Sequence, residues 1–421
     1  MPQPDASSLA HDFTKLIGAD RVRTAQGRET AIAEIVVEPE SADEIAEVVR
    51  RCERDRIPLA PLAAMRTQRL ISRVAVAVSL ARMNRVVAYE PDDMTVIAEA
   101  GLTLGSLNQI AAQRGQRLPA DPPAPELTTL GSLIASSKTG PLRLSEGTIR
   151  DLLIGIRFVG HGGRIVHAGG RVVKNVAGYD LMKLMTGSFG TLGIITEAAC
   201  KVRPIPPIYR LVVAGFAAIG MAFEAAQKAE RAAALYHCEV VSRAIAGAFA
   251  ERGEFILLAG FGGIPAEVEH QHNGLLASLG RDARILADAE AEAAYRWLRD
   301  LTPLEATVAA QIAVKPAELA RCLATLGVAF RAHALNGVAQ IWSDAGNHED
   351  PRDLVAKWRA IAHSARGHLR VIAASSEVRR DFAMFDVPPP PATALMKRLK
   401  AAFDPHNVFN PNCFVGGGHG L

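Results

Sequence analysis

The sequence predicts an α+β fold in which short strands and amphipathic helices occur in both halves of the chain. In the N-terminal half, a helix signal at 41–56 is followed by β-rich runs bounded by Gly, Pro, Asn or Asp. From about 209 to 390 the pattern changes to strand, long Ala-rich helix and strand, which indicates a separate sheet covered by helices. Proline clusters at 202–208 and 387–391 separate these parts, because proline cannot continue a helix or a central strand.

Each expected element has a local signal. Ser41 and Glu44 form a capping-box pattern ahead of apolar residues at helical spacing, and a second amphipathic helix is expected from Leu104 to Arg114. A short apolar run at 57–62 follows the first helix, and the expected strands of this half are the β-rich runs 74–80, 95–101, 152–160 and 163–170. In the second half, strands are expected at 209–216 and 253–261, and helices at 220–235 and 265–280.

Length and hydropathy indicate a water-soluble protein of two or three domains. The chain has 421 residues, of which 49% are hydrophobic and 22% charged. Its longest apolar stretch, Leu211 to Phe223, has 13 residues, too few to cross about 30 Å of hydrocarbon as a helix. The N-terminus lacks a basic region followed by an apolar one, so no secretory signal is expected and the expected location is the cytoplasm.

Charge and cysteine usage exclude several classes of partner and cofactor. The net charge is +3 and neither sign forms a long run, so nucleic acid is not an expected partner. The 5 cysteines are scattered and never form a CxxC pair. A disulfide framework, a zinc site and an iron–sulfur cluster held by this chain are therefore not expected.

The most informative stretch is glycine-rich and runs from Gly169 to Arg203. Its string from Lys174 to Leu181, followed by Gly187 to Glu197, resembles the FAD-binding domain of the vanillyl-alcohol-oxidase, or PCMH-type, flavoproteins. Within them it is similar to the FAD-binding E-subunit family of bacterial glycolate oxidases. Further motifs in the order and spacing of that family are 118–123, 129–135, 140–141, 147–151 and 403–411.

The resemblance covers about residues 30–205 and 391–414 and implies a domain plan. A PCMH-type two-subdomain FAD-binding domain is expected at 1–205, an α+β cap domain for substrate or partner at 206–390, and a C-terminal segment returning to the FAD domain at 391–421. A Rossmann fold is not expected, because the best glycine pattern after a strand, at 260–263, lacks the third glycine and the acidic residue.

The family places the flavin pyrophosphate against a glycine-rich loop, and the matching segment 61–68 contains no glycine. Alanine at a positive-φ position costs about 1 kcal/mol or more, and Met65 adds a side chain where phosphates would approach, although Arg66 supplies charge. Ser132 and Glu146 are two further departures from the family pattern. The resemblance implies non-covalent FAD and these cofactor-binding positions: Ala63, Ala64, Met65, Arg66, Thr67, Thr129, Gly131, Ser132, Gly140, Lys174, Asn175, Gly190, Ile195 and Thr196.

Two interpretations of these departures stay open. FAD binds through the surviving elements, or the domain keeps the fold and has lost the flavin. The completeness of the segment 174–197 favours weakened but retained binding.

Oxidation of a 2-hydroxy acid requires a base near the hydroxyl and usually an arginine for the carboxylate. The candidate bases are His348, His363 and His368, with Arg366 and Arg370 nearby, and their spacing fits no metal-ligand template. His368 stands where the E-subunit family shows a Gly-Gly-His stretch, so it is the catalytic candidate to mutate.

The resemblance implies a subunit that works with a catalytic FAD subunit and an iron–sulfur subunit, passing electrons from a 2-hydroxy acid such as glycolate to the quinone pool. Such a complex would bring the chain to the inner membrane as a peripheral protein. One alternative is a self-sufficient FAD-dependent 2-hydroxy-acid dehydrogenase. The other is a flavin-free structural subunit of such a complex.

Overall fold

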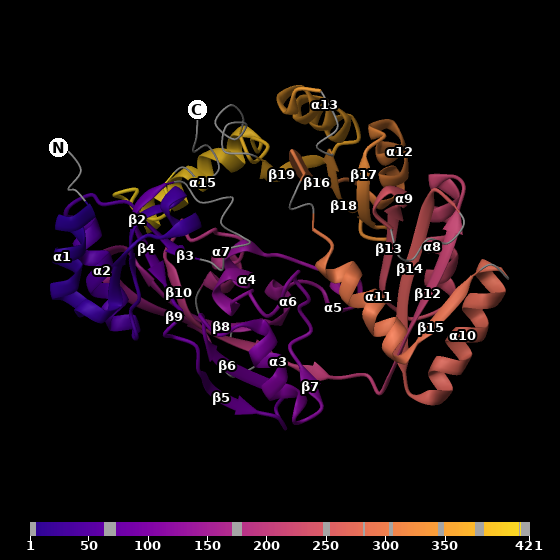
Figure 1. Ribbon diagram of the computed structural model, residues 1–421, viewed down its shortest axis with the longest axis horizontal. Helices are drawn as coiled ribbons and strands as arrows, with labels where there is room; N and C mark the ends of the chain where they lie inside the picture. Colours follow the sequence, from indigo (N-terminus) through magenta and orange to yellow (C-terminus); the bar gives the residue numbers. More distant parts are fainter. Residues whose placement is uncertain are drawn as a thin grey trace. The chain divides into compact units, whose positions relative to one another are not determined.

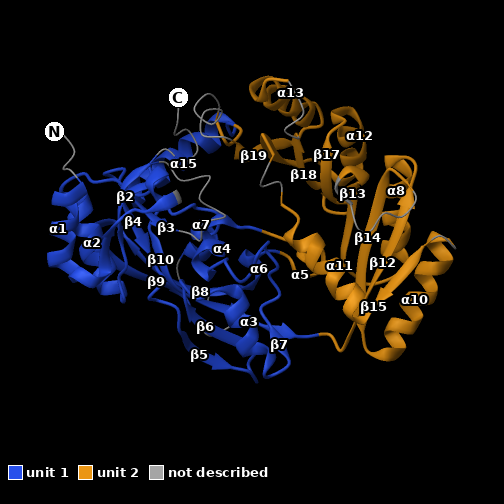
Figure 2. Ribbon diagram, viewed as in Figure 1, with its two compact units in different colours: residues 1–138, 148–205, 387–421 blue, residues 139–147, 206–386 orange. Residues whose placement is uncertain are grey.

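The computed structural model describes residues 6–62, 73–170, 179–246, 253–280, 283–302, 306–343, 349–374, 383–411 and 413. The chain divides into two compact units, shown in Figures 1 and 2. Unit 1 comprises residues 1–138, 148–205 and 387–421, and unit 2 comprises 139–147 and 206–386. Both units mix helices with sheets, which confirms the predicted α+β class.

The first half of unit 1 is built on a four-stranded sheet in the order β1-β2-β4-β3. Its strands are β1 (Val22–Thr24), β2 (Ala33–Val37), β3 (Leu59–Leu62) and β4 (Val74–Ser79). The helices α1 (Ala6–Ile17) and α2 (Ala42–Arg54) pack on it through a shared apolar core. Ser41 caps α2 as its sequence pattern predicts, accepting a hydrogen bond from the Glu44 amide at 3.2 Å.

The second half of unit 1 contains a five-stranded antiparallel sheet in the order β5-β6-β10-β8-β9. Its strands are β5 (Val86–Glu90), β6 (Thr95–Glu99), β8 (Leu153–Gly160), β9 (Arg164–Gly169) and β10 (Ile194–Lys201). The helices around it are α3 (Leu104–Ala112), α4 (Leu130–Ser136), α6 (Ile149–Leu152) and α7 (Leu181–Met185). Two short strands, β7 (Gln116–Arg117) and β11 (Arg203–Pro204), pair with one another as a separate antiparallel sheet.

The C-terminal segment returns to unit 1 after α15 (Pro390–Phe403). Val408 and Phe409 are buried in the core beneath the four-stranded sheet, and Phe409 forms a parallel bridge with Leu59. Lys400 and Asp404 hold this turn: the Lys400 Nζ donates to Asp404 Oδ2 at 2.6 Å and to the Thr191 carbonyl at 2.8 Å. The side chain of Asp404 in turn accepts from two backbone amides of the return segment.

Unit 2 is built on one eight-stranded sheet in the order β15-β12-β14-β13-β17-β18-β16-β19, with antiparallel neighbours throughout the described pairs. The strands are β12 (Ile208–Phe216), β13 (Leu235–Ser242), β14 (Phe255–Gly263), β15 (Arg284–Ala287), β16 (Val308–Ala313), β17 (Ala329–His333), β18 (Val338–Ser343) and β19 (His368–Ala374).

Helices cover both faces of this sheet. One face packs in a single apolar core with α8 (Ile219–Ala232), α10 (Pro265–Leu279), α12 (Pro316–Leu326) and α13 (Pro351–Ser364). The opposite face of the strands β12 to β14 packs against α11 (Asp288–Asp300). Two further helices among the described residues of this unit are α9 (Arg243–Ala246) and α5 (Arg143–Glu146), and α5 contacts β13. The sequence prediction of a helix at 220–235 is too long, because Leu235 already begins β13.

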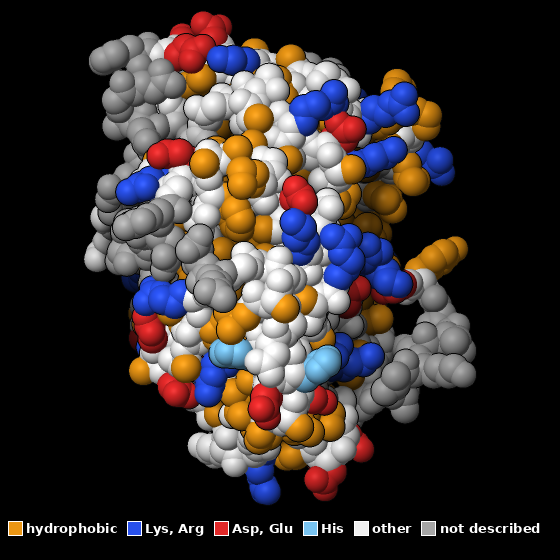
Figure 3. Space-filling model, turned by 90° about the vertical axis from the view of Figure 1, so that its right-hand side faces the viewer, with side chains coloured by type: hydrophobic (Ala, Val, Ile, Leu, Met, Phe, Trp, Pro, Cys, Tyr) orange, Lys and Arg blue, Asp and Glu red, His pale blue; other side chains and the backbone are white. Residues whose placement is uncertain are grey.

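Charged side chains of both signs lie beside one another on the face shown in Figure 3. Apolar side chains are scattered between them. Among the described residues, no helix is both long and apolar enough to span a bilayer.

Candidate functional site

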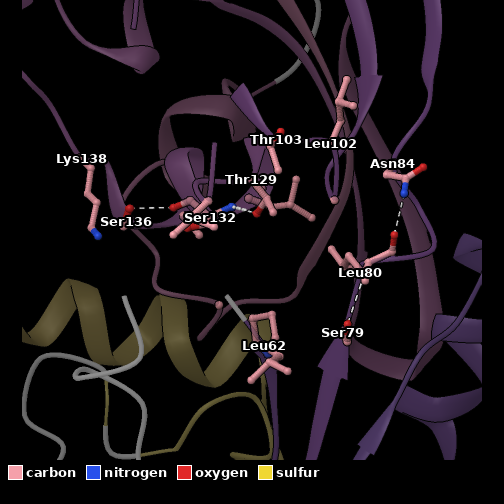
Figure 4. A pocket seen from close by; sticks show the side chains of 18 of the residues that line it. Leu62, Ser79, Leu80, Asn84, Leu102, Thr103, Thr129, Ser132, Ser136 and Lys138 are labelled. Carbon is pink, nitrogen blue, oxygen red and sulfur yellow. Dashed lines mark hydrogen bonds between the residues drawn. The ribbon is translucent and has the colours of Figure 1, made fainter. Parts of the chain in front are cut away.

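Unit 1 contains a cavity of about 670 Å³, within the size range of small-molecule sites. Segments far apart in the sequence form its wall, among them the end of β3, residues 79–84 and 101–106, the helix α4, the loop 187–193 and the return segment at Asn410. Figure 4 shows Thr129, Ser132 and Ser136 of the α4 region on one side of this space and Leu62 on the other.

Local hydrogen bonds fix α4 at the wall. The Thr129 hydroxyl accepts from the Ser132 amide at 3.3 Å, and the carbonyls of Leu102 and Ala100 accept from the amides of Leu130 and Gly131, both at 2.8 Å. The first amides of α4 are thus already used by the protein. Side chains and the shape of the wall, rather than these amides, determine what the cavity can hold.

Two of the predicted glycines allow close contact between segments of the wall. A Cβ on Gly131 would lie 2.9 Å from the Cβ of Ala100. A Cβ on Gly190 would lie 2.5 Å from Pro61 Cγ, and the φ of Gly190 is +69°, in the left-handed region that favours glycine. Both positions therefore require glycine for packing at the edge of the cavity.

Ser132 and Asn410 each contribute to the cavity wall and each carry a buried oxygen, Ser132 Oγ and Asn410 Oδ1, with no hydrogen-bond partner within the described ranges. A buried polar atom without a partner costs about 1–3 kcal/mol. A ligand rich in hydrogen-bond donors would offset this cost after small side-chain rotations. These residues fit a polar, hydroxyl-bearing ligand such as a flavin nucleotide.

The described residues of the wall include two carboxylates and one ammonium. Glu29 forms a bidentate ion pair with Arg23 at 2.6 and 2.9 Å, and the hydrogen bonds from Arg23 lower the pKa of Glu29. Glu126 and Lys138 also line the cavity, and Lys138 is the sole basic residue among its described wall. Lys138 is the side chain suited to an anionic group such as a diphosphate.

The predicted cofactor residues are brought together only in part. Thr129, Gly131, Ser132, Gly190 and Ile195 all line the cavity. Thr196 lies on β10 next to it, but its hydroxyl donates to the Arg157 carbonyl at 3.1 Å within the sheet. Gly140 groups with unit 2 and is not part of the wall. Ala63, Ala64, Met65, Arg66, Thr67, Lys174 and Asn175 lie outside the described residues.

Sequence reasoning missed Glu29, Glu126, Lys138 and Asn410 as wall residues. Asn410 belongs to the C-terminal signature 403–411, which is recognisable in the sequence. Its position at the cavity wall is not. Glu126 and Lys138 are single charged residues between motifs, and nothing in their spacing indicates a cavity.

The catalytic candidates lie in unit 2. His368 is exposed at the first position of β19, opposite Ala313. The His363 Nε2 lies 2.9 Å from Asp386 Oδ2, and His348 is outside the described residues. Arg370 contacts Gln311 at 3.2 Å, and burial lowers its pKa. In the described part of the chain, no group of three His, Cys, Asp or Glu side chains is placed to hold a metal ion.

Unit 2 also contains a buried polar group that the sequence did not indicate. His237 and Glu239 follow one another on the same face of β13. The Tyr209 hydroxyl lies 2.8 Å from His237 Nε2, and His333 Nδ1 lies 2.5 Å from Glu239 Oε1. A Cβ on Gly260 would come within 2.2 Å of His237 Nε2, so this glycine makes room for the imidazole.

Comparisons with known families agree with the geometry of unit 1. Residues 33–169 match the FAD binding domain, and residues 387–413 match the C-terminal domain of the FAD linked oxidases. FAD is therefore the cofactor of this domain. The second match contains Asn410, so both matched regions contribute to the cavity wall.

Curated relatives are similar over part of their length. D-lactate dehydrogenase of Anaerostipes hadrus is 36% identical over 177 residues, which cover 41% of this chain and 37% of the relative. Glycolate oxidase subunit GlcE of Escherichia coli (strain K12) is 40% identical over 122 residues, 29% of this chain and 35% of the relative. The chain thus matches little more than a third of the length of these relatives.

The fold of the whole chain has solved counterparts. A crystal structure of p-cresol methylhydroxylase with substrate bound superimposes with a TM-score of 0.75 at 15% identity, covering 99% of this chain and 98% of the other. A structure of alkyldihydroxyacetonephosphate synthase gives 0.72 at 17% identity, covering 97% and 85%. The predicted PCMH-type fold is confirmed.

Proposed function

We propose that this chain, which carries the FAD binding domain and C-terminal segment of the FAD-linked oxidases on a PCMH-type fold, is the FAD-binding subunit of a glycolate-oxidase-like 2-hydroxy-acid oxidoreductase. The observation that carries the proposal is the cavity of about 670 Å³, whose wall is formed by both matched regions. The 40% identity to subunit GlcE supports the subunit role. Partners would be a catalytic FAD subunit and an iron–sulfur subunit.

Different residues of the wall would contact different parts of FAD. Lys138 would neutralise negative charge of the diphosphate, and Ser132 would form a hydrogen bond after rotation of its hydroxyl. Apolar side chains, among them Leu62, Leu102 and Ile195, exclude water from the rings. When bound, the flavin supplies the two-electron oxidation of a hydroxyl-bearing carbon.

A second candidate function is a self-sufficient FAD-dependent 2-hydroxy-acid dehydrogenase. The 36% identity to D-lactate dehydrogenase favours it. His368 is then the proposed base, because an exposed imidazole at a strand end can accept a proton from a substrate hydroxyl.

The absorption spectrum of the purified full chain, before and after addition of excess FAD, tests the proposal. A flavin band that glycolate or D-lactate bleaches only after partner subunits are added supports the subunit role. Bleaching by the chain alone, lost in His368→Gln while the flavin band stays, supports the second function. A colourless protein that takes up no FAD overturns both and leaves a flavin-free structural subunit.

A matched pair of variants assigns the flavin to the cavity. Ala135→Phe places a ring in the cavity wall and should abolish FAD uptake, whereas Ala401→Phe on the exposed part of α15 should leave it unchanged. Equal uptake by both variants would place the flavin elsewhere.

A further inference from the structure

Glu126 is a carboxylate held at the cavity wall by a short hydrogen-bonded turn. Within the turn, the amides of Leu127 and Thr128 donate to the Ala124 carbonyl at 3.0 and 3.1 Å. The Gly105 amide of α3 donates to the Pro125 carbonyl at 3.1 Å, which ties the turn to the helix. The backbone of Glu126 is therefore fixed before any ligand binds.

The Glu126 side chain occupies space that only a glycine leaves free. A Cβ on Gly105 would lie 2.0 Å from Glu126 Oε2 and 2.5 Å from Oε1. Gly105 is buried in the first turn of α3, where the partial positive charge of the helix end favours a carboxylate. The absence of a side chain at position 105 thus seats the Glu126 carboxylate against the helix.

The described part of the chain places no hydrogen-bond donor against this carboxylate. Among the described residues, no hydrogen bond or ion pair joins Glu126 to another group, whereas the second wall carboxylate, Glu29, is paired with Arg23. Thr103 and Ser106 line the cavity on the same helix end, and their hydroxyls already bond one another at 2.9 Å. Glu126 is exposed, so water supplies its donors in the free protein, and a ligand that enters the cavity must replace them with donors of its own.

FAD offers two kinds of group to such a wall, and their effects are opposite. Its phosphates would be repelled by a carboxylate, and its sugar hydroxyls would donate to it. Figure 4 shows Lys138 apart from Thr103, which lies at the N-terminal end of α3. The Glu126 carboxylate suits a vicinal pair of hydroxyls, because its two oxygens can accept from both.

We propose that Glu126, seated by Gly105, accepts hydrogen bonds from sugar hydroxyls of bound FAD and is a determinant of FAD affinity. The inference rests on the proposed occupancy of the cavity by FAD. The hydroxyls belong to the adenosine ribose or to the ribityl chain, and both sources share this chemistry.

Dissociation constants of FAD, FMN and ADP for the purified full chain and its Glu126→Gln variant test the proposal. Hydrogen bonds to a charged group are worth about 1.5–3 kcal/mol, so we expect Glu126→Gln to bind FAD about tenfold or more weakly. If Glu126→Gln binds ADP more weakly and FMN as well as wild type does, the hydroxyls belong to the ribose. If it binds FMN more weakly and ADP as well as wild type does, they belong to the ribityl chain. Asp93→Asn, which changes an exposed carboxylate of unit 1 outside the cavity wall, is the matched control and should bind FAD normally.

A second variant tests the same contact without removing the carboxylate. Gly105→Ala would displace the Glu126 side chain, so it should weaken FAD binding in the wild-type background and have little further effect in Glu126→Gln. Circular dichroism of the FAD-free proteins verifies that each variant is folded.

The direction in which Glu126→Gln changes the FAD affinity tests the proposal. FAD binding as tight as wild type, or tighter, would mean that Glu126 faces phosphate or open solvent, and would overturn the proposal. A wild-type chain that binds no FAD would overturn the proposed function instead.

Discussion

The side-chain amide of Asn410 donates to the carbonyl of Phe189 over 2.7 Å, joining two residues that are 221 positions apart. The Asn410 backbone amide also donates to the Leu59 carbonyl at 2.7 Å. Asn410 therefore connects the C-terminal return segment both to the first residue of β3 and to the loop that carries Gly190. All three segments contribute residues to the cavity wall.

Replacement of Asn410 by alanine should destabilise unit 1. The Phe189 carbonyl would lose its donor, at a cost of about 1–3 kcal/mol. Asn407→Ala is the matched control, because Asn407 is exposed and also has a positive φ, +51° against +40° for Asn410. Urea unfolding should show a larger decrease in the free energy of unfolding for Asn410→Ala than for Asn407→Ala. Equal losses would mean that the bond to Phe189 contributes nothing.

Gly190→Ala should lower both stability and FAD affinity. Its backbone lies in the left-handed region, which costs an alanine about 1–2 kcal/mol, and the new Cβ would meet Pro61 at the cavity edge. Gly220→Ala, in the first turn of α8 with open space around it, should instead leave stability unchanged or raise it. Thermal unfolding of both variants, with and without FAD, measures these differences. A neutral Gly190→Ala would show that Pro61 moves away freely.

Much of the fold could be predicted from the sequence because its signals are local. The capping pattern at Ser41 and the apolar run of β4 each depend on a few neighbouring residues, and both elements form where expected. The helix prediction at 220–235 was too long because the alanines before Leu235 suit a helix and carry no stop signal. The start of β13 is decided by pairing with β14 and β17, which is not a local property.

The site could be predicted only where a motif carries it. Gly131 and Gly190 belong to recognisable strings, and both line the cavity. Glu126 is different: its carboxylate becomes part of a site because a distant turn packs on Gly105, and no spacing rule encodes that contact. The same holds for Glu239 and His333, whose strands pair across 94 residues.

Single and double variants of the Glu239 and His333 pair should be strongly non-additive. Both side chains are almost fully buried and their atoms lie 2.5 Å apart. His333→Leu leaves the Glu239 carboxylate buried without its partner, which costs about 3–5 kcal/mol of unfolding free energy. The double change Glu239→Leu with His333→Leu should cost less than the sum of the single changes in urea unfolding. An additive result would show that the two groups do not interact.

The stability of unit 2 should fall in acid because of His237. Burial, together with repulsion from His333, lowers the pKa of His237 to about 3, against about 6.5 in the unfolded chain. Between these values the unfolded state binds a proton that the folded state does not, so this contribution to stability is complete above the higher pKa and is lost as the pH falls. The other polar groups of this region are Tyr209, which contacts His237, and Glu239, which contacts His333.

His237→Phe tests this assignment because it keeps a ring of similar size without the titrating group. We expect the unfolding free energy of wild type to fall more steeply between about pH 6.5 and pH 4 than that of His237→Phe. Tyr209→Phe removes the hydroxyl that contacts His237 and keeps the imidazole. The unfolding free energy of this variant should therefore change with pH as steeply as that of wild type. Parallel curves for wild type and His237→Phe would show that this imidazole is protonated equally in the folded and unfolded states, and that another group causes the acid sensitivity.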